Sequence, residues 1–121
     1  MNVSPPIDLD YLRQFSEGDT AFEQELLELF VADSQTHLAA VKAAIITQDL
    51  ETVRQKAHQL KGSSSNVGAN VMQDLAAQLE QAAKQETLEK VSTWFAELEA
   101  AYAAVATFVT HWKAGLDRLV P

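Results

Sequence analysis

Cysteine is absent from the chain, which excludes a disulfide framework and a thiolate metal site and removes any need for an oxidising compartment. Glycine and proline are scarce, at four and three residues. Aromatic and β-branched residues do not gather into the short alternating runs of strands. Long stretches rich in Ala, Leu, Glu, Gln and Lys remain, and these residues favour helices. The composition therefore predicts an all-α protein.

Basic residues are also few, with nine Lys and Arg against 17 Asp and Glu and a formal charge of -8. Such a surface repels phosphate backbones, so no nucleic-acid partner is expected. The longest weakly polar run, residues 100–109, is too short to span a bilayer, and residues 1–10 lack the features of a signal peptide. We expect a cytoplasmic protein without a membrane partner.

The length of 121 residues and the 47% apolar content fit one domain with one core. We assign residues 1–121 to that single domain, with 1–7 as a flexible lead and a helical bundle over about 8–116. A short first helix is expected to begin after the N-cap Asp8, to direct Leu12 and Phe15 toward the core, and to end at Gly18.

The second helix is expected to open at Thr20 and Glu23, which have the spacing of a capping box, and to run to about Gln48. Its expected inner side comprises Phe22, Leu26, Leu29, Phe30, Val41 and Ile45. The acidic residues of its first turns, Glu23, Glu25 and Glu28, are interpreted as a solvated face.

The third helix is expected to follow the N-cap Asp49, to end within residues 65–68, and to carry an inner stripe of Leu50, Val53, Ala57, Leu60 and Ser64. A fourth covers about Ala69 to Lys84, with Met72, Leu75, Leu79 and Ala82 or Ala83 inward. A fifth, capped by Thr87 and stopped by Gly115, has apolar residues in regular four-three steps, namely Val91, Phe95, Leu98, Tyr102, Val105, Val109 and Trp112.

Short links between long amphipathic helices are typical of antiparallel neighbours. The sequence thus predicts an up-down-up-down four-helix bundle, with the short N-terminal helix as a lid.

One histidine falls outside the apolar stripe of the third helix. With about 100° per residue, the stripe averages near -30° from Ala57 and His58 lies at about 100°, facing water. Its side of the helix is shared by Arg54, Lys61, Gly62 and Ser65.

These neighbours suit a phosphorylated imidazole, which needs cationic donors that an acidic surface does not otherwise provide. Lys61 is the best placed and Arg54 the second. Gly62 is about 1 kcal/mol worse than Ala inside a helix, so we interpret it as room for another protein's backbone beside the ring. Imidazole is a neutral nucleophile at cytoplasmic pH and holds phosphate in a labile N–P bond.

The segment resembles the histidine phosphotransfer (HPt) domains of two-component phosphorelays. The residues that match the family pattern are His58, Leu60, Lys61, Gly62, Ser63, Ser64, Val67, Gly68, Ala69, Leu75, Leu79 and Glu80. Residues 26–45 are similar to the second helix of such domains. Met72 and Ala76 depart from the pattern, where Leu and often Cys stand, and both changes affect packing only.

The resemblance implies that His58 accepts a phosphoryl group, that Lys61 contacts its oxygens and that Gly62 leaves room for a receiver domain. The docking face would be the exposed sides of the second and third helices. The partner would be a response-regulator receiver, a hybrid sensor histidine kinase, or both. The module itself would be a monomeric carrier without kinase activity or cofactor, and the receiver would supply Mg²⁺.

Two other functions stay open: a helical adaptor without phosphate chemistry, and the dimerisation and phosphoacceptor region of a sensor kinase. The second lacks the acidic residue, Arg and Pro expected after its histidine. His37 and His111 are interpreted as structural. The three histidines are 21 and 53 residues apart, and without an i,i+4 pair or carboxylate partner no metal site is expected.

Overall fold

The computed structural model describes residues 5–119, except for the side chains of residue 114 and residues 116–119, and none of the described residues forms a strand. Five helices follow one another along the described chain: α1 (Leu9–Ser16), α2 (Thr20–Ile46), α3 (Leu50–Val67), α4 (Asn70–Lys84) and α5 (Leu88–Leu119). The prediction of an all-α protein is confirmed. Within the described range, no helix combines the length and apolarity needed to cross a bilayer.

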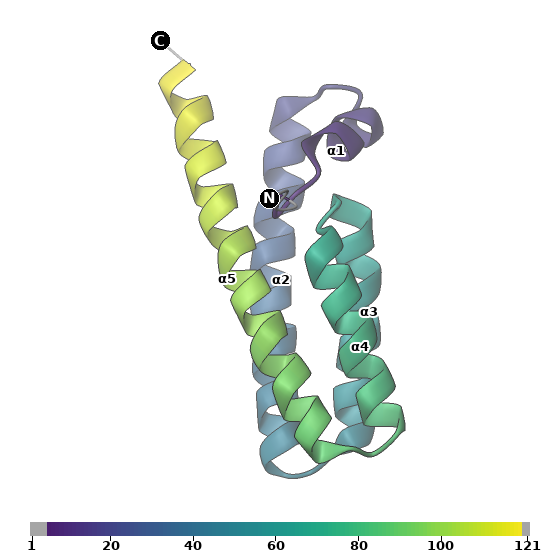
Figure 1. The fold of residues 1–121 in the computed structure, drawn as a ribbon. Coiled ribbons are helices and arrows are strands. Elements are labelled where there is room, and N and C mark those ends of the chain that lie inside the picture. Colours follow the sequence, from purple (N-terminus) through teal and green to yellow (C-terminus); the bar gives the residue numbers. More distant parts are fainter. Residues whose placement is uncertain (1–4, 120–121) are drawn as a thin grey trace.

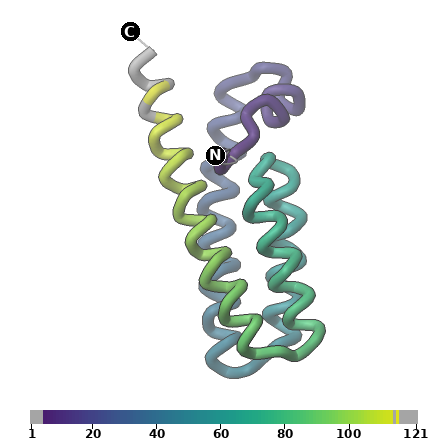
Figure 2. The backbone as a smooth tube through the Cα atoms, in the orientation of Figure 1, coloured from purple at the N-terminus to yellow at the C-terminus, as the bar shows by residue number. Residues whose placement is uncertain are grey.

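The four long helices form an antiparallel bundle in which each packs against two others (Figure 1). α3 contacts α2 and α4, and α5 closes the ring by contacting α4 and α2. The α2–α3 and α4–α5 connections lie at one end of the bundle, whereas α1 and the α3–α4 turn lie at the other (Figure 2). This is the predicted up-down-up-down order with α1 across one end.

The start of α1 is hydrogen-bonded to the end of α3. The backbone N–H of Asp8 donates to the carbonyl of Gly68 at 2.9 Å, and the carboxylate of Asp8 accepts from the N–H of Tyr11 as the predicted N-cap. Ile7, which the sequence places in the flexible lead, is buried in the core together with Leu12. Residues 1–4 of that lead lie outside the described residues. Phe15 is not directed inward as predicted, because its side chain is 58% exposed.

The start of α2 differs from the predicted capping box. Asp19, not Thr20, is the N-cap, and its carboxylate accepts from the N–H of Phe22 at 3.0 Å. Glu23 is neither a capping residue nor part of a solvated face: it is buried and accepts a hydrogen bond from Ser16 at 2.5 Å. This hydrogen bond joins the end of α1 to the first turn of α2.

The inner face of α2 is also rotated from the prediction. Phe30 and Val41 are buried as expected, but Phe22 and Leu29 are exposed and the core instead receives Leu27, Leu38 and Ala44. The remaining helices follow their predicted stripes more closely. Val53, Ala57, Leu60, Met72, Leu79, Val91, Phe95, Leu98, Val105 and Val109 are all buried.

The two ends of α3 agree with the prediction, whereas the end of α5 does not. Asp49 is the N-cap of α3 as predicted, and Gly68 ends the helix in a left-handed conformation with φ of 76°, where glycine is favoured. Gly115 does not end α5, which continues to Leu119. Tyr102, half-buried, fastens α5 to α2 by donating its hydroxyl to the carbonyl of Val31 at 3.0 Å.

Candidate functional site

His58 lies on the outer side of α3, and its side chain is 62% exposed, as the helical projection predicts. The positions beneath it, Ala57 and Leu60, are buried in the bundle. Because the backbone around His58 belongs to a continuous packed helix, the ring is presented to solvent from a rigid support.

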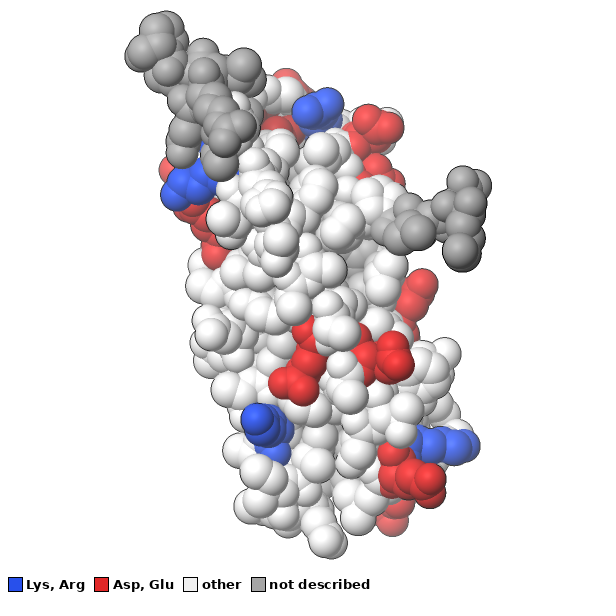
Figure 3. Space-filling view, turned by 60° about the vertical axis from the view of Figure 1, so that its left-hand side comes forward, with Lys and Arg blue, Asp and Glu red and all other residues white. Residues whose placement is uncertain are grey.

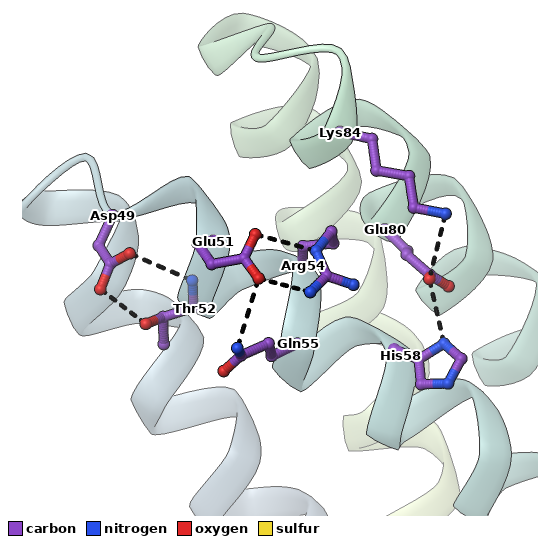
Figure 4. A network of polar contacts seen from close by, with 8 residues as sticks. All are labelled: Asp49, Glu51, Thr52, Arg54, Gln55, His58, Glu80 and Lys84. Carbon is purple, nitrogen blue, oxygen red and sulfur yellow. Dashed lines mark hydrogen bonds and ion pairs between the residues drawn. The ribbon is translucent and has the colours of Figure 1, made fainter.

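A carboxylate from another helix holds the ring. Glu80 of α4 is only 7% exposed, and its Oε2 lies 3.0 Å from Nδ1 of His58. Figure 4 shows Glu80 against one nitrogen of the ring, while the other nitrogen is directed away. The prediction that no histidine has a carboxylate partner is therefore wrong for His58, and His37 also lies 3.9 Å from Asp33, one turn earlier in α2.

Two lysines share the same carboxylate. Nζ of Lys61 lies 2.8 Å from Oε1 of Glu80, and Nζ of Lys84 lies 3.6 Å from Oε2. Burial raises the pKa of the Glu80 carboxyl, but the hydrogen bonds from Lys61 and His58 outweigh it and bring the pKa below the ordinary value of 4.5. Glu80 is thus an anion at neutral pH.

The charge of Glu80 assigns the tautomer of the ring. A carboxylate only accepts hydrogen bonds, so Nδ1 of neutral His58 must carry the hydrogen and donate it. Nε2 then keeps its lone pair and faces solvent. The arrangement provides an exposed, oriented nitrogen nucleophile beside two ammonium groups.

The other predicted site residues, Gly62, Arg54 and Ser65, have different environments in the structure. Gly62 is exposed, and a Cβ added to it would meet nothing within 4 Å, so the open space beside His58 is present. Arg54 is one turn before His58, but its Nε donates to Glu51 at 3.0 Å and the guanidinium is engaged there. Ser65 is half-buried, and its carbonyl accepts from the N–H of Gly68 at the end of α3.

Sequence reasoning did not identify Glu80 and Lys84 as site residues. A signal was available for Glu80, which is four residues after Ala76 and three before Ala83 and therefore on the inward side of α4. A charged residue on a buried face needs partners, and Lys84 follows it by one turn. No cluster of three or more His, Cys, Asp or Glu placed to bind a metal occurs among the described residues.

Comparisons with known proteins agree with this fold. The sequence model of one family, the Hpt domain, matches residues 25–108, which is more than half of the chain. The phosphorelay intermediate protein rdeA of Dictyostelium discoideum is 28% identical over 111 residues, covering 92% of this chain and 44% of that protein. The chain thus spans less than half the length of this relative.

Solved structures show the same architecture. Histidine-containing phosphotransfer protein B of Pseudomonas aeruginosa PAO1 superposes with a TM-score of 0.86 and 28% identity, over 93% of this chain and 97% of that one. The maize histidine-containing phosphotransfer protein ZmHP2 has the same fold, with a TM-score of 0.84 and 21% identity over 100% and 91% of the two chains. Because the family model matches residues 25–108 and the fold agrees with these structures, the chain belongs to the Hpt domain family.

Proposed function

We propose that the protein is a phosphorelay intermediate that carries a phosphoryl group on Nε2 of His58. The observation that carries the proposal is the exposed ring whose Nδ1 is held by the buried carboxylate of Glu80. Membership of the Hpt domain family and the similarity to the phosphorelay intermediate rdeA support it.

In the transfer, the lone pair of Nε2 attacks the phosphorus of an aspartyl phosphate on a receiver domain. The P–O bond to the aspartate breaks, and its electron pair leaves with the aspartate carboxylate. The hydrogen on Nδ1 stays in place, and Glu80 stabilises the positive charge that the ring gains. The reverse reaction uses the same groups.

The chain supplies positioning rather than a complete catalytic centre. It presents the nucleophile and, on Lys61, a cation for the phosphoryl oxygens, whereas the receiver supplies Mg²⁺ and the phosphorylated aspartate. We therefore propose a carrier without kinase activity of its own. As the sequence predicts, it would act as a monomer in the cytoplasm.

A docking surface for the receiver lies between α2 and α3. A shallow groove of about 130 Å³ is lined by Leu26, Leu29, Phe30, Asp33, Ser63, Asn66 and Val67, next to the open position of Gly62. Among the lining residues, Leu29 is 67% exposed. The groove and this side chain would give the receiver an apolar surface to pack against. On the face seen in Figure 3, Lys and Arg are few and separated by uncharged surface, unlike a nucleic-acid interface.

The proposal is tested by incubating the protein with a phosphorylated receiver and measuring acid-labile, alkali-stable label on this chain. We expect label on the wild type, on His37→Gln and on His111→Gln, and none on His58→Gln. Label on His58→Gln at the wild-type level would refute the assignment. No label on any form, with receivers that phosphorylate other carriers, would instead favour the helical adaptor.

The docking surface has a matched control at the other end of α2. Leu29→Ala should weaken transfer without changing stability by more than about 0.5 kcal/mol, because the side chain is exposed. Ile46→Ala is the control, because Ile46 is 75% exposed at the far end of α2 and its truncation removes a similar apolar surface away from His58. Equal transfer rates for Leu29→Ala and Ile46→Ala would exclude the α2–α3 groove as the docking surface.

A further inference from the structure

A single buried carboxylate at the site has two ammonium partners from different helices. Lys61 reaches Oε1 of Glu80 from α3, and Lys84 reaches Oε2 from the next turn of α4. One cation is enough to balance one carboxylate. Because a buried carboxylate without a balancing charge is strongly destabilising, and the neutral ring of His58 supplies none, at least one of the two lysines must stay with Glu80 in the resting protein.

Phosphorylation changes what this cluster must balance. A phosphoryl group on Nε2 brings nearly two negative charges to the ring that Glu80 already contacts through Nδ1. Lys61 is three residues from His58 on the same helix face and is the nearer cation for the phosphoryl oxygens. If Lys61 turned to the phosphoryl group without a substitute, Glu80 would keep only the ring of His58 as a partner, and the phosphoryl group on that ring brings more negative charge than the ring gains positive charge.

We propose that Lys84 is a positioning residue that neutralises Glu80 while Lys61 moves from Glu80 to the phosphoryl group. This inference rests on the proposed function and assigns Lys84 no contact with phosphate. Figure 4 shows Lys84 and His58 on different sides of Glu80. A lysine four residues after a glutamate is the favourable orientation for an ion pair along one helix.

Arg54, the other cation near His58, is less suited to this exchange. Its guanidinium is paired with Glu51 through two nitrogens, on the N-terminal side of His58. Lys84 already contacts the carboxylate that Lys61 would leave. The exchange therefore needs no rearrangement of a third side chain.

A double-mutant cycle in the full chain tests the proposal. Lys84→Gln should slow transfer from a phosphorylated receiver to His58 by about fivefold, the upper range for a partly exposed ion pair. In a Glu80→Gln background, where Lys61 has no carboxylate to leave, the same substitution should change the rate less than about twofold. Lys84→Arg should retain most of the wild-type rate, because it keeps the charge.

Lys42→Gln is the matched control, since it removes the same charge from the α2–α5 side of the bundle, where Lys42 lies beside Tyr102 and Glu99. It should leave transfer unchanged. An equal loss for Lys84→Gln in the wild-type and Glu80→Gln backgrounds would mean that Lys84 contacts phosphate or the receiver directly, and would overturn the proposal. A rate for Lys84→Gln no lower than for Lys42→Gln would also overturn it.

A second measurement does not depend on the folding of Glu80→Gln. Nitrogen NMR of unphosphorylated Lys84→Gln should show the hydrogen of His58 still on Nδ1, because Lys61 still holds Glu80. Loss of this tautomer would show that Lys84 organises the resting ring, contrary to the proposal. Failure of the proposed function itself is distinguishable, because the wild-type protein would then accept no label.

Discussion

Replacement of Gly62 by glutamine should make the protein more stable and its phosphotransfer slower. Gly62 is in the interior of α3, is exposed, and has no atom within 4 Å of the position of an added Cβ. A side chain at this position therefore meets no steric barrier in the isolated protein. The glycine has no local structural role that would explain its presence in the helix.

The gain in stability follows from helix propensity. Glycine inside a helix is about 0.8–1.0 kcal/mol less favourable than alanine, and glutamine is close to alanine. We expect Gly62→Gln to raise the free energy of unfolding by about 0.5–1 kcal/mol. For a chain of 121 residues this corresponds to an increase in Tm of about 2–5 °C.

The loss of function has a separate cause. A glutamine side chain at position 62 would stand one turn from His58, on the surface where the receiver must approach. Overpacking at a close contact is typically worth about 1–3 kcal/mol, so we expect transfer to slow by about tenfold or more.

Urea unfolding followed by circular dichroism measures the stability, and transfer of label from a phosphorylated receiver measures the function. Gly115→Gln is the control, because Gly115 is also helical with open space around its Cβ position but lies near the end of α5. It should not affect transfer. Lower stability of Gly62→Gln than of the wild type would show that a side chain at position 62 does meet a steric barrier. Unchanged transfer would show that the glycine is not needed for the approach of the receiver.

Three further predictions concern the polar groups that join the helices. Folding lowers the pKa of Glu80, so its contribution to stability is present above the ordinary pKa of 4.5 and is lost as the pH falls through the lower folded-state pKa. In a plot of the urea midpoint against pH, Glu80→Gln should therefore show a smaller loss of stability at acid pH than the wild type. Parallel acid limbs for the two proteins would contradict this. Tyr102→Phe removes the hydrogen bond to Val31 and should lower the free energy of unfolding by about 1 kcal/mol, measured by urea unfolding; an unchanged value would show that the hydrogen bond adds nothing to the α2–α5 contact. Ser16→Ala leaves the buried Glu23 without its hydroxyl donor and should cost about 1–3 kcal/mol, with faster amide exchange in α1 than in the wild type; equal exchange rates would argue against this fastening of α1.

Features that depend on neighbours within a few residues were predictable from the sequence. Asp8 and Asp49 are N-caps because a carboxylate meets the free N–H groups of the next turn whatever the rest of the chain does. The four-three spacing in α5 fixed its buried side for the same local reason. The exposure of His58 followed from its angle to a well-defined stripe.

α2 was less predictable because apolar residues occupy almost every position between Leu26 and Val31. Such a segment has no single apolar face, so the choice of Leu27 over Leu29 for the core depends on how α3 and α5 pack against it. Gly115 did not end α5, because glycine is permitted inside a helix at a modest cost in stability.

The sequence alone thus determined the helices, their order and the histidine that faces solvent, since these depend on caps, periodicity and spacing along one helix. Only the packing of α3 against α4 brought Glu80 to His58, across 22 positions of the sequence, and gave Lys61 and Lys84 a common partner. A contact between two helices depends on their relative rotation and depth, which no single helix specifies. For that reason the nucleophile was readable in the sequence, whereas the group that orients it was not.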